Sequence, residues 1–258
     1  MRQNMTKSIV AGLFMMVFMI LSANSQEKVS VAAASNISSI AVPLQAAFSA
    51  DFPAYKIEFT FGASGALATQ ILNGAPFQVF LSADTSFPQN LVDAKMTSGA
   101  TRVYAVGKLI FLTTKTLDLS RGLSVLLDAS IAQFANSNPE TAPYGRAAQE
   151  ALVKTGLLDK VKGKLVTAQT VTQALQFTLT SVDAGFVNKS ALYSAELKAW
   201  NKEGTYWFEV DPTLYAPIEQ GFVVVKSAAS LPAVAAFSTF LLSPHAQAVF
   251  ASYGYGTP

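Results

Sequence analysis

Hydrophobic residues along the chain fall into two kinds of pattern that take turns. Short runs rich in β-branched and aromatic residues predict strands, at 29–34, 58–61, 79–81, 102–106, 109–112, 165–166, 184–187 and 218–225. Stretches with apolar residues at helical spacing predict helices, at 36–48, 67–72, 87–96, 147–155, 173–179, 232–242 and 244–253. The segment 123–134 has no clear period and stays unassigned. The alternation predicts an α/β protein of two doubly wound lobes joined by two crossing segments.

The stretch from Phe59 to Asp84 is the most informative part of this pattern. Its first strand leaves through the small residues 62–65 into a short helix, which Asn73 and Gly74 are expected to end. Its second strand leaves through 82–84, which are also small or polar. Because parallel strands end at the same edge of a sheet, both loops are expected at the edge where open α/β sheets bind ligands.

Two serines, Ser35 and Ser64, follow strands and precede helices. A serine in this position is most often only a helix cap. The unpaired N–H groups of a helix N-terminus also favour an anion, and small neighbours let these groups approach it closely. We call each turn from a strand through a serine into a helix a serine corner. On adjacent parallel strands the two serine corners would face one another across a crevice, so the pair predicts an anion site more strongly than either serine alone. Further helix starts follow the loop 136–146 and the residues 170–172.

The first 25 residues have the pattern of a secretory signal peptide. Positive Arg2 and Lys7 precede the apolar run 9–21, and a small-x-small motif at 23–25 precedes Gln26. The apolar run is shorter than the roughly 20 residues that a membrane helix needs. We therefore expect a signal peptide at 1–25, cleavage before Gln26 and a periplasmic mature protein.

The expected lobe limits follow from the strand pattern. The first part of lobe 1 covers 26–107, lobe 2 covers 108–211, and 212–258 returns to lobe 1. A strand interrupted at 106–108 is the expected crossing point.

Composition restricts the possible partners. Cleavage would remove two of the 18 Lys and Arg residues and none of the 16 acids, which leaves a neutral mature chain. A nucleic-acid or anionic-membrane partner is therefore not supported. The chain has no cysteine, so it has neither a disulfide nor a lipid-anchored cysteine, which favours a free periplasmic protein. Without a Cys/His cluster we expect no bound transition metal. We also expect a monomer without a cofactor.

Six strings resemble the periplasmic molybdate-binding proteins of ABC transporters: AAASN at 32–36, FGASGALATQI at 61–71, GAPFQVFLSAD at 74–84, PYGRAAQEAL at 143–152, VTQAL at 171–175 and SPHAQAVFASYGY at 243–255. Their order and spacing together are specific, and the similarity spans essentially the whole mature chain. The resemblance implies a periplasmic binding protein of type II architecture. It also implies two lobes that close on molybdate or tungstate and deliver it to a membrane permease.

The resemblance further implies which residues hold the oxyanion, which that family binds without cations. Hydroxyl and amide donors fall on Ser35 and Ser64, and backbone amides fall on Ala83, Tyr144 and Val171.

The sequence departs from the family pattern in three places. Asn188 stands where many members carry a tyrosine whose hydroxyl touches the oxyanion, and its amide can also donate, although it is shorter. Gln78 replaces a usual aspartate, and Pro43 lies inside the first predicted helix.

Two alternative functions stay open. A site that offers only donors leaves the proton of hydrogen phosphate unpaired, at roughly 1–3 kcal/mol for each unmade bond. Sulfate carries no such proton, so only the size of the cavity separates it from molybdate, and sulfate or another tetrahedral oxyanion is the first alternative.

The second alternative is a periplasmic serine hydrolase. Its nucleophile elbow needs glycine two residues after the serine, where this chain has Ala66. His245 is the only histidine, and it follows Ser243 and Pro244 at the expected start of a helix, which places it on the surface. We therefore expect no enzyme.

Overall fold

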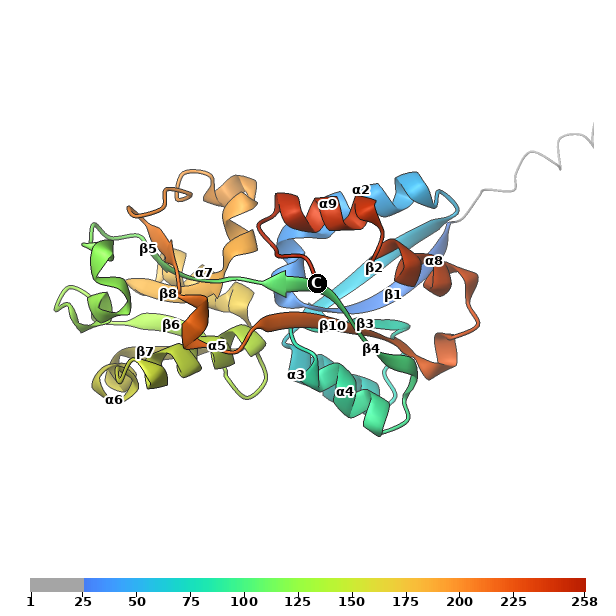
Figure 1. Ribbon diagram of the computed structural model, residues 1–258, viewed down its shortest axis with the longest axis horizontal. Helices are drawn as coiled ribbons and strands as arrows, with labels where there is room; N and C mark the ends of the chain where they lie inside the picture. Colours follow the sequence, from blue (N-terminus) through green and yellow to red (C-terminus); the bar gives the residue numbers. More distant parts are fainter. Residues whose placement is uncertain (1–25) are drawn as a thin grey trace, which may run out of the picture.

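The structure is a computed structural model that describes residues 26–258, so the expected signal peptide at 1–25 lies outside the described residues. Two five-stranded sheets, each flanked by helices, form two lobes that lie side by side (Figure 1). This arrangement confirms the predicted α/β class with two doubly wound lobes.

The first sheet has the strand order β2-β1-β3-β10-β4. Its strands are β1 (Glu27–Ala34), β2 (Tyr55–Gly62), β3 (Val79–Leu81), β4 (Thr97–Gly107) and β10 (Ile218–Val225). The helical segments of this lobe are η1 (Ser35–Ile40), α2 (Ala41–Asp51), α3 (Ser64–Leu72), α4 (Ser86–Asp93), η7 (Lys226–Ala228), α8 (Pro232–Phe240) and α9 (Pro244–Ser252). β1 pairs in parallel with β2 and β3, with Ala34 opposite Gly62. The two serine corners therefore leave adjacent strands at one edge, as the sequence predicted.

The second sheet repeats this plan with the order β7-β6-β8-β5-β9. Its strands are β5 (Leu109–Thr113), β6 (Phe134–Ser137), β7 (Leu165–Ala168), β8 (Ala184–Asn188) and β9 (Trp207–Glu209). Its helical segments are η2 (Leu119–Leu127), α5 (Pro143–Lys154), α6 (Leu158–Val161), η3 (Lys162–Lys164), α7 (Val171–Thr180), η4 (Lys189–Tyr193) and η5 (Ala195–Leu197), and η6 (Pro212–Leu214) lies in the segment that returns to the first sheet. In both sheets three parallel strands are followed by two strands that run against their neighbours.

The chain crosses between the sheets twice. β4 ends at Gly107 and β5 begins at Leu109, and the return lies between Glu209 and Ile218. Gly256 pairs with Val106, so the C-terminus also lies at the junction of the lobes (Figure 1). From this sheet membership we propose the expected lobe limits of 26–107, 108–211 and 212–258.

Three predicted elements differ in the structure. The helix expected at 36–48 is split into η1 and α2, and Pro43 is tolerated because the third residue of a helix has no intrahelical partner for an N–H. The helix expected from Ala147 already begins at Pro143, whose fixed φ suits a first helical position. The segment 123–134, which stayed unassigned, contains the later part of η2 and the start of β6, a buried strand of only four residues.

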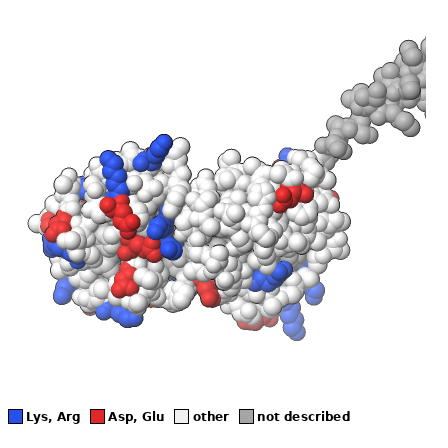
Figure 2. All heavy atoms as spheres, turned by 45° about the horizontal axis from the view of Figure 1, so that its top comes forward, with Lys and Arg blue, Asp and Glu red and all other residues white. Residues whose placement is uncertain are grey.

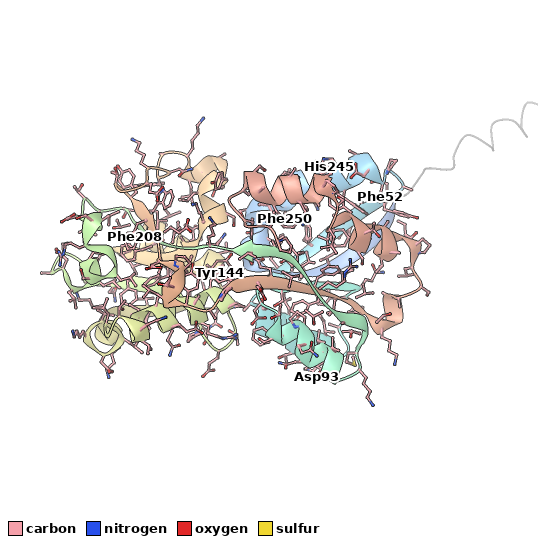
Figure 3. All side chains as sticks on the ribbon, in the orientation of Figure 1. Phe52, Asp93, Tyr144, Phe208, His245 and Phe250 are labelled. Atoms are coloured by element: carbon pink, nitrogen blue, oxygen red, sulfur yellow. The ribbon has the colours of Figure 1, made fainter. Side chains whose placement is uncertain are left out.

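Buried apolar side chains form the core of each lobe. In lobe 1 one cluster packs Phe48 edge-on against Phe237 and Phe240, and a second fills the opposite face of the sheet around Phe80. In lobe 2 Phe208, labelled in Figure 3, stacks on Phe111 at 5.2 Å between ring centroids. Within residues 26–258 no single helix has the length and apolar composition to cross a membrane; only α8 and α9 together, with a bend of 56°, would satisfy both measures.

Candidate functional site

A small cavity lies between the two lobes, at the carboxyl ends of the parallel strands. The centre of a water-sized sphere can occupy about 10 Å³ of this cavity, which is about the space that one water molecule needs. Lobe 1 lines it with residues 34–36, 62–64 and Ala83, and lobe 2 lines it with 142–144 and Val171. None of these lining residues is charged, so the walls offer only neutral groups.

Four helical segments begin at this cavity. η1 begins at Ser35, α3 at Ser64, α5 at Pro143 and α7 at Val171. The first N–H groups of a helix have no intrahelical partner, and the helix dipole gives them partial positive charge. Backbone donors from both lobes therefore surround one small space, which is an arrangement that suits an anion.

Ser64 is a lining residue and not the cap of its helix. Ala63 occupies the cap position of α3, and it makes no side-chain capping bond. The Ser64 side chain is buried, and its Oγ accepts a hydrogen bond from the Ala83 N–H at 3.0 Å. Because the oxygen already accepts this bond, the hydroxyl proton is left to donate.

Ser35 has a comparable position in the neighbouring corner. It is 7% exposed, and Ala34 occupies the cap position without a side-chain bond. The Ser35 carbonyl accepts a hydrogen bond from Thr172 Oγ1 of lobe 2 at 2.9 Å. The Gly65 N–H donates to the Thr141 carbonyl, also at 2.9 Å. These two bonds join the walls of the cavity across the lobes.

Five of the six residues that the sequence indicated therefore line one cavity, and Asn188 does not. It is buried at the end of β8, where its Nδ2 donates to Ser190 Oγ at 2.6 Å. It lines a neighbouring interlobe groove of about 270 Å³ together with Ser38 and Thr172. Sequence reasoning missed Asn36, which also lines the cavity and directly follows Ser35 in the string AAASN.

The departure at Gln78 has a structural explanation. Gln78 lies before β3, at the end of the strand away from the cavity, and its Oε1 accepts a hydrogen bond from the Ser30 N–H at 2.9 Å. Its side chain therefore joins the segment before β3 to the neighbouring strand β1.

The charges next to the cavity pair with each other across the lobes. Arg146 in the first turn of α5 donates to Asp84 Oδ2 at 3.1 Å, and its guanidinium lies over the ring of Phe87. The Asp84 carboxylate also accepts the Phe87 N–H. On the face seen in Figure 2, charged side chains of both signs are intermixed over lobe 2, and the surface of lobe 1 is mostly uncharged.

Three buried tyrosines lie at the cavity or next to its lining residues, and Tyr144 lines it directly. Burial raises the pKa of Tyr104 and Tyr144 well above the usual 10.0, and it raises the pKa of Tyr255 to about 12. All three hydroxyls therefore stay protonated and neutral over the ordinary pH range.

These shifts predict a loss of stability in alkaline solution. A tyrosine in the unfolded chain ionises near pH 10, whereas the folded state holds these groups neutral. The stabilisation is complete below about pH 10 and is lost as the pH rises through the folded pKa values. We expect the midpoint of urea unfolding to fall between about pH 9 and about pH 11, and to fall less in Tyr255→Phe. An equal midpoint at both pH values would contradict this expectation.

Comparison with known proteins gives consistent results. The family model for bacterial extracellular solute-binding proteins matches residues 29–256. The molybdate-binding protein ModA of Azotobacter vinelandii is 36% identical over 89% of this chain and 90% of its own length. ModA of Rhodobacter capsulatus is 36% identical over 79% of this chain and 78% of its own length. The solved periplasmic molybdate-binding protein of Azotobacter vinelandii covers 90% of this chain and 99% of that one, with a TM-score of 0.81 and 32% identity.

Proposed function

The chain belongs to the family of bacterial extracellular solute-binding proteins, and on this basis we propose that it binds molybdate in the periplasm and delivers it to the permease of an ABC importer. The relatives named molybdate-binding proteins support this choice of ligand. The observation that carries the proposal is the interlobe cavity, which is lined by neutral groups from both lobes and by the starts of four helical segments.

The lining suits a fully ionised tetrahedral anion. Oriented N–H groups and hydroxyls stabilise negative charge through their dipoles, so that no positively charged residue is required in the cavity. Among the groups that we assign to the anion all are donors, so the proton of hydrogen phosphate would be unpaired against them, which costs roughly 1–3 kcal/mol. Tungstate, which has the same shape and charge as molybdate, is expected to bind as well.

We assign the donors as follows. The Ser35 and Ser64 hydroxyls and the Tyr144 and Val171 amides donate to the oxyanion. The Ala83 amide already donates to Ser64 Oγ, so it acts on the anion by polarising this hydroxyl.

The sixth candidate, Asn188, takes a different role in this proposal. It lies outside the cavity, and its Nδ2 donates to Ser190 Oγ. Ser190 Oγ in turn donates to the Tyr255 hydroxyl of lobe 1 at 3.0 Å. Its amide therefore supports the contact between the lobes.

Binding requires the lobes to move. Each of the five candidate donor residues at the cavity is buried, so an anion can reach them only when the lobes separate. Closure then brings the donors of lobe 2 onto an anion already held by lobe 1. We propose that the mature protein, after removal of residues 1–25, works in this way as a monomer without a cofactor.

A hydrolytic function lacks support at the same site. The partner of Ser64 Oγ is the Ala83 N–H, which cannot act as a general base. His245 lies on the surface at the start of α9, with a half-exposed side chain whose Nδ1 is 3.0 Å from Asp51. We therefore propose a binding protein that is not an enzyme.

Titration calorimetry with molybdate, tungstate, sulfate and phosphate tests the proposal. We expect molybdate and tungstate to bind much more tightly than sulfate, and phosphate to give no heat of binding. Sulfate binding tighter than molybdate would contradict the assigned ligand, and the absence of binding by all four anions would contradict the assigned class of ligand.

A further inference from the structure

Gln220 is the centre of a buried hydrogen-bond network beside the cavity. It lies on β10 and is fully buried. Its Oε1 accepts hydrogen bonds from Asn36 Nδ2 and from the Tyr104 hydroxyl, both at 2.9 Å. Its Nε2 donates to the Tyr144 hydroxyl at 3.1 Å. A single amide therefore holds three side chains.

Two of these partners belong to opposite walls of the cavity. Asn36 lines it from lobe 1, and Tyr144 lines it from the first turn of α5 in lobe 2. Figure 3 shows Tyr144 at the junction of the lobes. The chain of contacts Asn36–Gln220–Tyr144 thus runs from one wall to the other, and we call it the wall bridge.

The wall bridge packs directly against the crossing backbone. A Cβ atom placed on Gly107 would overlap the Tyr144 hydroxyl oxygen and would lie 2.8 Å from Gln220 Nε2. At the other end, Asn36 Nδ2 also donates to the Tyr255 hydroxyl at 2.9 Å. Both ends of the bridge are therefore held when the lobes are closed.

We propose that Gln220 is a positioning residue that fixes the spacing between the two walls and thereby determines the size of the oxyanion that the cavity accepts. This inference rests on the proposed function. Sulfate and molybdate are both tetrahedral dianions, so a wall of neutral donors can separate them only by size. If the walls close to a spacing set for the larger ion, the smaller one is left with overlong hydrogen bonds to one wall, and such bonds weaken quickly with distance.

The test removes the bridge without shortening the side chain. Gln220→Met keeps a side chain of similar length and deletes the bonds to both walls. The bonds from Thr172 to the Ser35 carbonyl and from Gly65 to the Thr141 carbonyl still join the lobes in this variant, so only the side of the cavity near Tyr144 is released. Because this side can then adjust to the smaller ion, we expect the preference for molybdate over sulfate, measured as the ratio of their Kd values, to fall by about tenfold. A substitution that only loosened the fold would weaken the binding of both anions by the same factor and leave the ratio of their Kd values unchanged.

A matched control uses a second glutamine of lobe 1. Gln247 Nε2 donates to the carbonyls of Tyr104 and Leu241, so its bonds stay within one lobe. We expect Gln247→Met to keep the anion preference of the wild type within about twofold.

A further variant covers the case in which Gln220→Met does not fold. Tyr144→Phe deletes one link of the bridge and leaves the backbone amide in place, so the preference should fall in the same direction. Suppose that the wild type binds molybdate. If the variants that fold keep its ratio of Kd values, or bind both anions more weakly by the same factor, the role of Gln220 is refuted while the proposed function stands. If the wild type binds neither anion, the proposed function fails first and this inference fails with it.

Discussion

Replacing Gly65 with leucine is expected to weaken molybdate binding more than any other single change considered, by about 3–6 kcal/mol. A Cβ atom at this position would lie 2.8 Å from Phe87 Cζ and 3.1 Å from Thr141 Cα of the opposite lobe. The backbone of Thr141 cannot yield as a side-chain tip can, so the added side chain would hold the lobes apart. The anion would then lose the donors of Tyr144 and Val171, and each hydrogen bond to a charged group contributes about 1.5–3 kcal/mol.

The effect should be specific to closure. Gly163 has open space where a Cβ would be placed, so Gly163→Leu is a control of the same size that should leave affinity unchanged. Calorimetry gives the affinity. With molybdate present, small-angle scattering should show that the Gly65→Leu protein stays open, whereas the wild type is closed. A closed variant with wild-type affinity would show that the contact between Gly65 and Thr141 does not limit closure.

Replacing Ser64 with alanine is expected to weaken molybdate by about 1.5–3 kcal/mol, or roughly 10- to 150-fold in Kd. The substitution removes a donor to the anion and also leaves the buried Ala83 N–H without its acceptor. Ser35→Ala should fall in the same range, toward its lower end, because no second bond to the Ser35 hydroxyl is lost with it.

A capping serine far from the cavity provides the control. Ser243 Oγ accepts the Ala246 N–H at the start of α9, so Ser243→Ala should lower stability by about 1 kcal/mol and leave the affinity unchanged. Wild-type affinity in both Ser35→Ala and Ser64→Ala would contradict the assignment of these hydroxyls to the site.

Much of the fold could be predicted because its strands and helices carry strong periods. The strands Val79–Leu81 and Ile218–Val225 have the predicted limits, since a proline or a polar residue stands at each of their ends. The two serine corners could be placed together because Ala34 and Gly62 end parallel neighbours, a relation that follows from the βα alternation.

Other features depend on tertiary packing that no local pattern shows. β6 and β9 are strands of only four and three residues, and they are stabilised by pairing with strands far away in the sequence. The N-terminus of α5 was placed four residues late, because the turn-rich string before it hides that Pro143 and Tyr144 are already helical. Likewise the position of Asn188 beside Ser190, outside the cavity, depends on the path of η4 after β8.

Gln220 shows the limit of sequence reasoning about the site. Its neighbours in the chain indicate only a buried strand, and its partner Asn36 lies 184 residues away. The wall bridge exists because two distant segments meet at the crossing. The one available signal was a glutamine next to the apolar run that ends this strand.

The central claim is that neutral donors from both lobes hold a doubly charged anion. A crystal structure of residues 26–258 grown with molybdate tests it most directly. The account predicts the anion in the cavity between the lobes, within hydrogen-bond distance of the Ser35 and Ser64 hydroxyls and of the Tyr144 and Val171 amides. A lysine or arginine side chain bonded to the anion, or an anion bound elsewhere with this cavity closed, would contradict it.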